Sequence, residues 1–425
     1  MDCTNETTQQ SRYIKARTAK KHSIPLCLIL CFLSVWCISP PLFINGAVRY
    51  ISLFAMLAGL VYTAFCMKKV DFYSAVLLFY VAYSCFAGVN LQGSDYILQN
   101  VQLFILLGIA YMAYQNQNKE AYIKSKAFLW VVLCIYPVWM FLTIQTYAVV
   151  PNISRALAGN DRADTIYWSL RGVGGYGMVY SIVIMIPILI YILKNIRFRN
   201  KFQTALVWVN LILSVALILM AGYSLALLIS VIGIFFILLY KQRGLDSFLK
   251  ILLAVIALLI VYILFRNNFL NWIVDITKGS MYERKVVDII NSMMENQSTG
   301  TLEARVVRYQ LSWETFIEHP IFGCFIQGSN DVGGHSYFLD MFARFGLFGG
   351  LSFLYLVIAP LVKMFRSNRN PSMYLTAIVQ VLVLGFTNNF SAAMAPILYL
   401  LPLAVEQYCG LFGNETGGCQ NEKPV

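Results

Sequence analysis

Charged residues are scarce in this chain of 425 residues. Asp, Glu, Lys and Arg together make up 12% of the sequence, whereas 59% is hydrophobic and 15% is aromatic. A soluble domain usually carries about twice that share of charge. The composition therefore excludes an ordinary water-soluble protein and predicts an all-α polytopic membrane protein.

Apolar runs of roughly 17 to 25 residues, the length that a transmembrane helix needs, occur about twelve times. They cover 24–44, 48–66, 71–89, 97–114, 126–150, 173–193, 202–220, 223–240, 250–265, 346–362, 372–390 and 392–411. The runs 202–220 and 223–240 can also be drawn as one bent segment, which would reverse the orientation of everything downstream. The first run lacks a small-residue cleavage pattern after it, so we expect a retained span rather than a signal peptide.

Basic residues collect in alternate loops. With twelve spans, about two-thirds of the 32 Lys and Arg fall on one side, and cytoplasmic loops carry such an excess. We therefore expect a basic cytoplasmic tail at 1–23 and a second cytoplasmic tail at 412–425, in a cytoplasmic (inner) membrane. The merged-helix alternative is disfavoured because it would send the basic loops after residue 240 outside.

The predicted domains follow from this assignment of spans and loops. A membrane domain of about nine helices spans 24–265, an extracytoplasmic loop spans 266–345, and three C-terminal transmembrane helices span 346–411. The loop is far longer than ordinary connections. Its periodicity predicts one amphipathic helix over 281–295 and another over 302–318.

The helix over 302–318 has Thr301 as a possible N-cap and Pro320 as a stop signal. Its charges are segregated around the helix: Arg305, Arg308 and Ser312 lie along one edge, and Glu303, Glu314 and Glu318 lie on the far side. One interpretation is that an anion lies against the arginine edge. The other is that these arginines pair with carboxylates elsewhere in the fold.

Histidine is also scarce: the chain has three, at 22, 319 and 335. His335 follows two glycines and precedes apolar residues at helical spacing, so we expect it at the N-terminus of a helix. The partial positive charge there disfavours imidazolium, which predicts a neutral imidazole able to accept a proton. Asp340 and Arg344 are four residues apart and can pair along the same helix as scaffold.

Cysteine and acidic motifs that hold metals are missing. Most of the ten cysteines lie in apolar runs, and no Cys-x-x-Cys pair occurs. We therefore expect neither a disulfide framework nor a zinc site. No Asp-x-Asp or His/Asp cluster predicts a metal cofactor. The net charge of +12 follows from topology and needs no nucleic-acid partner, although the basic inner loops are expected to attract anionic membrane lipids.

An earlier outer loop carries a second candidate. Arg171 stands in a glycine-rich stretch, 169–177, that enters a span. An arginine at the mouth of a helix can hold an anion. The alternative is that the glycines serve helix packing and that Arg171 reaches toward the membrane surface.

The late loop also carries a motif. Its elements are Trp313, Pro320-Ile321-Phe322-Gly323, His335-Ser336 and, after nine further residues, Gly346 and Gly349. This motif, with about twelve spans, a large late outer loop and an earlier Arg-Gly loop, resembles bacterial O-antigen polymerases and O-antigen ligases. Two positions depart from many relatives: the turn 221–224 lacks their arginine, and Phe325 replaces a second glycine.

The resemblance implies a GT-C-like membrane glycosyltransferase without metal or nucleotide. By position, Arg171, Arg305 and Arg308 would bind the diphosphate of a glycan donor linked to undecaprenyl diphosphate. His335 would act as catalytic base toward a glycan acceptor, with Ser336, Asp340 and Arg344 in support. The late loop 266–345 would thus be the catalytic segment.

The expected activity is inverting polymerisation of oligosaccharide repeat units of an O-antigen, capsule or exopolysaccharide. A chain-length regulator and a flippase are the protein partners that such a role would imply. Two alternatives stay open. One is a ligase that transfers the glycan to a lipid A core or another acceptor, and the other is a flippase or transporter.

Overall fold

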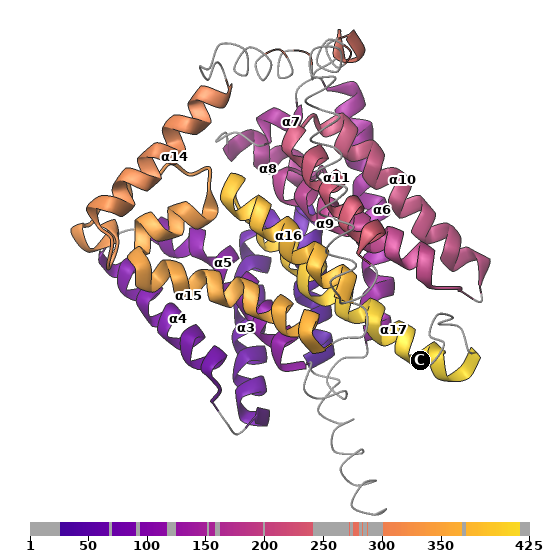
Figure 1. Ribbon diagram of the computed structural model, residues 1–425, viewed down its shortest axis with the longest axis horizontal. Helices are drawn as coiled ribbons and strands as arrows, with labels where there is room; N and C mark the ends of the chain where they lie inside the picture. Colours follow the sequence, from indigo (N-terminus) through magenta and orange to yellow (C-terminus); the bar gives the residue numbers. More distant parts are fainter. Residues whose placement is uncertain are drawn as a thin grey trace, which may run out of the picture.

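The computed structural model describes residues 26–67, 70–90, 94–116, 125–150, 153–157, 162–198, 200–240, 301–367 and 371–416, with isolated positions between 272 and 287. Every element within these ranges is helical (Figure 1). The predicted span 250–265 and almost all of the predicted helix 281–295 lie outside the described residues. So do the tail 1–23 and the end of the chain after residue 416.

Six described helices are long and apolar enough to cross a membrane: Gly46–Phe65, Phe72–Asn90, Ala127–Val149, Tyr176–Asn195, Lys201–Ala221 and Tyr337–Ser367. Four shorter apolar helices cover Leu26–Ile38, Asn100–Gln115, Ser224–Leu239 and Pro371–Thr387. The described chain is thus an all-helical polytopic membrane protein. The count of about twelve spans remains a prediction.

The helices keep the order of the apolar runs. After Leu26–Ile38, the elements are α2 (Pro40–Ile44), α3 (Gly46–Met67), α4 (Phe72–Asn90), α5 (Ser94–Asn116), α6 (Ser125–Val149), α7 (Ile153–Ala156), α8 (Arg162–Leu170), α9 (Tyr176–Asn195), α10 (Lys201–Ala221), α11 (Ser224–Leu239), α14 (Thr301–Glu318), η1 (Cys324–Gln327), α15 (Tyr337–Ser367), α16 (Pro371–Thr387), η2 (Ala392–Met394), η3 (Pro396–Leu400) and α17 (Leu401–Thr416). The late-loop helix predicted over 302–318 is α14, which ends two residues before Pro320.

The runs 202–220 and 223–240 form two helices. Gly222 separates α10 from α11 in the left-handed conformation, with φ 70°. Glycine adopts this conformation without the steric penalty that a Cβ brings. Both helices pack against α9. The bent single helix is therefore ruled out.

Two apolar runs are interrupted at prolines. The first run breaks at Ser39, which is extended before Pro40 at the start of α2. The last run begins as a 3-10 turn, continues as a π-helical turn from Pro396, and becomes α-helical only at Leu401. The outer loop 151–172, for which no helix was predicted, contains the short helices α7 and α8.

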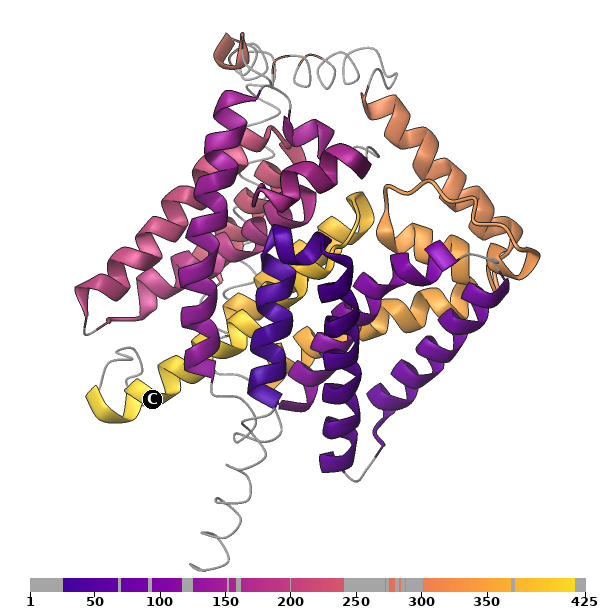
Figure 2. The same cartoon turned by 180° about the vertical axis from the view of Figure 1, so that it is seen from behind.

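The helix of the late loop, α14, is supported by a group of packed helices. α14 packs on α15, and α15 also packs on α16, α4 and α5. Figure 1 shows α14 at one edge of the molecule, with α16 running diagonally through its middle. Figure 2 shows the opposite side, where α3 and α4 cover the same scaffold.

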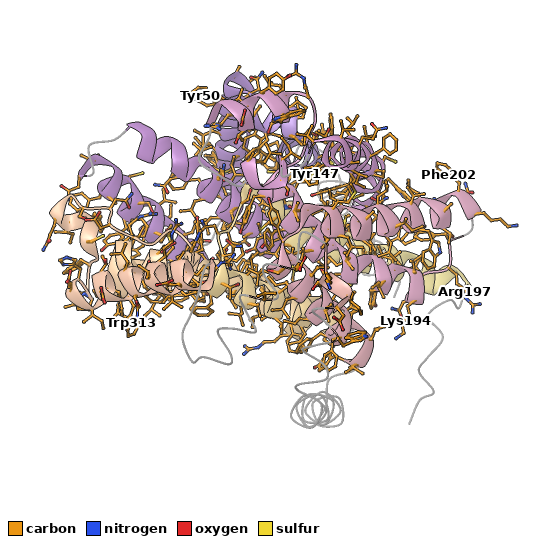
Figure 3. The ribbon with its side chains drawn as sticks, turned by 90° about the horizontal axis from the view of Figure 1, so that it is seen from above. Tyr50, Tyr147, Lys194, Arg197, Phe202 and Trp313 are labelled. Carbon is orange, nitrogen blue, oxygen red and sulfur yellow. The ribbon has the colours of Figure 1, made fainter. Side chains whose placement is uncertain are left out.

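Helix α14 and the basic end of α9 lie toward opposite ends of the molecule. In Figure 3, Trp313 of α14 lies toward one end, and Lys194 in the last turn of α9 and Arg197 just after it lie toward the other. Trp313 is 52% exposed. Whether the late loop and the basic loops face opposite sides of a membrane remains a prediction from the sequence.

Candidate functional site

The loop after α14 is fixed to a break in α15. Gly346 has φ 63° and ψ −164° inside that helix. A Cβ on Gly346 would overlap the Ile321 carbonyl oxygen, and a Cβ on Gly323 would overlap the carbonyl oxygen of Arg344. The Leu347 N–H, freed by the break, donates to the Pro320 oxygen at 2.8 Å. These motif glycines therefore let two backbone segments touch.

The end of α4 holds the same loop from the other side. The Tyr83 hydroxyl donates to the Phe322 oxygen at 2.7 Å. The Asn90 amide donates to the oxygens of Phe325 at 2.7 Å and Ile326 at 2.9 Å. The loop is thus anchored to a membrane helix before it reaches His335.

The histidine segment lies directly against α14. A Cβ on Gly333 would overlap the backbone of Arg308, so only glycine permits this approach. The Gly333 N–H donates to Ser312 Oγ at 2.9 Å, and Gly334 has φ 73°. The two glycines before His335 therefore bring its ring beside the arginine edge of α14.

Asp340 ties α14, the loop and α15 together. Its Oδ1 accepts hydrogen bonds from Ser312 Oγ at 2.6 Å and from the Gly334 N–H at 3.2 Å. Asp340 is 3% exposed and Ser312 is 1% exposed. Arg344, its predicted partner, donates through Nε to Asn330 Oδ1 at 2.7 Å. Asp340 thus holds the histidine loop on α14.

Ser336 precedes α15 and is buried. Its carbonyl oxygen accepts the Asp340 N–H at 2.8 Å, and its Oγ lies 3.5 Å from the Leu339 nitrogen and 3.4 Å from the Gly385 oxygen. Ser336 therefore occupies the N-cap position. This agrees with the expectation that His335 lies at a helix N-terminus.

His335 makes one hydrogen bond through each ring nitrogen. Nε2 lies 2.9 Å from Arg308 Nη1, and Nδ1 lies 3.1 Å from the Gly334 carbonyl oxygen. A guanidinium offers only donors, so Nε2 must accept. The proton then resides on Nδ1 and is donated to Gly334. This arrangement fits a neutral imidazole with a defined tautomer.

The surroundings lower the pKa of His335. Burial is the main cause, the positive charges of Arg308 and Arg305 add to it, and the hydrogen bond to the Gly334 oxygen opposes it. The direction agrees with the neutral imidazole expected from the sequence. The physical cause differs, because burial and two guanidinium groups act here in addition to any helix dipole.

Arg305 lies one turn before Arg308 on α14 and is half-buried. Its charge acts on the ring of His335 and on the hydroxyls of Tyr176 and Tyr180 near the start of α9. Arg305 is therefore near enough to the histidine loop and to α9 for its charge to act on both. The structure thus brings the two α14 arginines and His335 together.

Two asparagines at the end of α16 complete this surface. The Asn389 side-chain amide donates to the Gly334 carbonyl oxygen at 2.8 Å, and the Asn389 backbone carbonyl oxygen accepts from Tyr176 Oη at 2.8 Å. The Asn388 amide donates to Tyr180 Oη at 3.0 Å. In the sequence, Asn388 and Asn389 fall inside the apolar run 372–390. Their only sign of a functional role in the sequence is that two adjacent amide side chains stand near the end of an apolar run.

The turn that lacks the relatives' arginine carries a tyrosine instead. The Tyr223 ring stacks on Tyr180, with centroids 6.1 Å apart and planes at 11°. The Tyr223 hydroxyl donates to the Ser154 oxygen of α7 at 2.5 Å. This turn therefore adds packing and a hydrogen bond beside α9.

Arg171 is placed differently from the other candidates. It follows α8, its guanidinium lies 3.5 Å from the Tyr167 ring centroid, and its Nη1 donates to the Tyr167 oxygen at 3.3 Å. No contact among the described residues joins it to His335, Arg305 or Arg308. A shared role with them remains a prediction.

Cationic and neutral polar groups dominate this site. Within the described ranges, His, Cys, Asp and Glu form no group of three or more that could hold a metal ion. No protein-family model matches the sequence, and no curated protein matches it. The resemblance to O-antigen polymerases and ligases therefore rests on the motif residues and on the predicted arrangement of spans and loops.

Proposed function

We propose that the protein is a membrane glycosyltransferase that polymerises oligosaccharide units carried on undecaprenyl diphosphate at the outer face of the cytoplasmic membrane. The observation that carries the proposal is the placement of His335. Its unprotonated Nε2 lies 2.9 Å from Arg308 Nη1, and the charge of Arg305 also reaches the ring. A neutral base beside two permanent cations suits a reaction in which an anion departs.

The proposed step transfers one glycosyl group. An acceptor sugar hydroxyl attacks C1 of the donor sugar, and the bond between C1 and the diphosphate oxygen breaks with its electron pair leaving on the diphosphate. His335 Nε2 takes the hydroxyl proton. Attack opposite the leaving group inverts the anomeric centre. The products are a glycan longer by the transferred unit, undecaprenyl diphosphate and an imidazolium that returns its proton to water.

The arginines act on the leaving group. A guanidinium binds phosphate oxygens through two parallel N–H bonds and stays charged at every relevant pH. One donor aimed at developing charge contributes a few kcal/mol to transition-state stabilisation. Arg305 and Arg308 are one helical turn apart on α14, so both can face one diphosphate.

Two features support a lipid-linked donor. The site is built at the ends of apolar helices, since Tyr176 of α9, Asp340 of α15 and Asn389, two residues after α16, all contribute to it. It also belongs to the α14 end of the molecule, away from Lys194 and Arg197 (Figure 3). A substrate with a membrane-embedded tail and a polar diphosphate would reach such a site from the bilayer.

The test is to replace His335→Ala and Arg305→Ala separately and to measure glycan chain length in cells with confirmed protein levels. We expect both variants to lose long polymer. His319→Ala is the matched control, because this histidine ends the same α14 and its described hydrogen bonds use only backbone atoms. Polymer of ordinary length from the His335→Ala protein would contradict the assignment of His335 as the catalytic base.

A further inference from the structure

The Nε2 atom that must accept a proton is already occupied. Arg308 Nη1 donates to it at 2.9 Å, and the other ring nitrogen is held by the Gly334 oxygen. A lone pair that accepts a hydrogen bond from a guanidinium cannot take a proton from a sugar hydroxyl at the same time. The base as it stands is therefore blocked.

The blocking group can leave. Arg308 is an exposed residue, so solvent and an incoming ligand can reach its side chain. No ion pair with a carboxylate holds Arg308 or Arg305 among the residues that the structure describes. A diphosphate carries negative charge and can accept two parallel N–H bonds from a guanidinium, whereas the neutral imidazole offers it a single lone pair. Exchange of the imidazole for a diphosphate should therefore be favourable for Arg308.

The base itself is held in place independently of Arg308. The Gly334 oxygen that receives the His335 Nδ1 proton also accepts from Asn389 at 2.8 Å. The Gly334 N–H is bonded to Asp340 at 3.2 Å. Withdrawal of Arg308 would thus free Nε2 while leaving the ring and its tautomer unchanged.

We infer that Arg308 is a substrate-operated cap on His335: a diphosphate draws the guanidinium away from Nε2, so the base becomes available only after the donor has bound. This inference rests on the proposed function, since it takes the donor to carry a diphosphate. The cap would keep His335 from activating water or acceptor before a donor is present. Binding would then be ordered, with the donor first.

Diethyl pyrocarbonate tests the cap without any glycan. It modifies neutral imidazoles at an unoccupied nitrogen, and peptide mass spectrometry reports the rate for each histidine in the full-length protein. We expect slow modification of His335 in the wild type and a rate roughly tenfold higher in Arg308→Gln, because a hydrogen bond to a charged group is lost. Inorganic diphosphate should speed the wild-type reaction and leave the Arg308→Gln rate unchanged.

The matched control is Glu314→Gln, on the far face of α14, which should leave the His335 rate unchanged. His319 serves as an internal reference in every sample. Equal His335 rates in the wild type and Arg308→Gln would overturn the cap, and so would a wild-type rate that inorganic diphosphate fails to raise. Glycan chain length in the His335→Ala protein decides the proposed function separately, so the two failures can be told apart.

Discussion

His335 presents its two ring nitrogens to different partners, a backbone carbonyl and a guanidinium. This division sets its tautomer, and burial beside two cations sets the direction of its pKa. The sequence indicated a neutral histidine and, separately, an arginine edge on the helix over 302–318, but not that the two meet. It also did not show what Asn388 and Asn389 contact, because their contacts join segments that are far apart in the chain.

Arg308→Gln should shift the pH dependence of glycan transfer. The imidazole must be neutral to act as base, so a lowered pKa keeps it active to more acidic pH. Removal of one lowering charge raises the His335 pKa, and the acid limb of kcat/KM should therefore move to higher pH. The measurement is kcat/KM across pH for the wild type, Arg308→Gln and the control Glu314→Gln. An acid limb that stays in place or moves to lower pH in Arg308→Gln would contradict the assignment.

Two replacements of Asp340 should distinguish the effect of its hydrogen bonds from the effect of its charge. Asp340→Ala leaves the buried Ser312 Oγ without its acceptor, at about 1 to 3 kcal/mol, and also removes the acceptor of the Gly334 N–H. Asp340→Asn keeps an oxygen at the same place. We expect the Ala variant to melt at a lower temperature and to transfer glycan more slowly than the Asn variant. Equal behaviour of the two would show that Asp340 does not hold the loop.

At the scale of elements, the late loop depends on close backbone contacts. Pro320, Gly323 and Gly346 appeared in the sequence as spaced motif residues, and their function in the fold is to seat the loop on the break in α15. Spacing alone could not reveal this, because the two segments meet only in three dimensions. Helix α14 could be predicted from its periodicity and stop signal, whereas α7 and α8 are too short to show a clear period.

Gly346→Ala should destabilise the protein and misplace the loop. Its φ of 63° disfavours any Cβ, and the added atom would overlap the Ile321 backbone, which cannot move aside as a flexible side chain would. Backbone strain of this kind costs of order 1 to 3 kcal/mol. The melting temperature in detergent should fall, and transfer should fall with it. Gly46→Ala is the control, because nothing lies within 4 Å of its added Cβ; equal melting of the two variants would exclude the proposed role of the α15 break.

For the whole molecule, composition was sufficient to predict a helical membrane protein, because apolar runs of spanning length leave few other solutions. Gly222 separates α10 from α11, and its left-handed conformation cannot be seen in a hydropathy pattern. Breaks at Pro40 and Pro396 likewise interrupt runs that look continuous in hydropathy. The number of spans remains a prediction from the apolar runs, and their orientation remains a prediction from the basic loops.

Cysteine labelling tests that orientation. Gln327→Cys lies in the exposed part of the late loop, and Lys201→Cys lies at the start of α10. With a membrane-impermeant maleimide, we expect Gln327→Cys to react in intact cells and Lys201→Cys only after the membrane is opened. The parent protein, which has its own cysteines, sets the background. Labelling of both positions from the same side would contradict the topology.

The most direct test of the proposed function uses purified protein in phospholipid vesicles with an oligosaccharide linked to undecaprenyl diphosphate. Released undecaprenyl diphosphate and glycan length are measured together for the wild type and for His335→Ala. We expect the wild type to release one lipid diphosphate for each unit added. The variant should be slower by about 10² to 10⁴, the usual contribution of general-base assistance. A wild-type protein that lengthens no glycan, or a His335→Ala protein that lengthens it at the wild-type rate, would contradict the account.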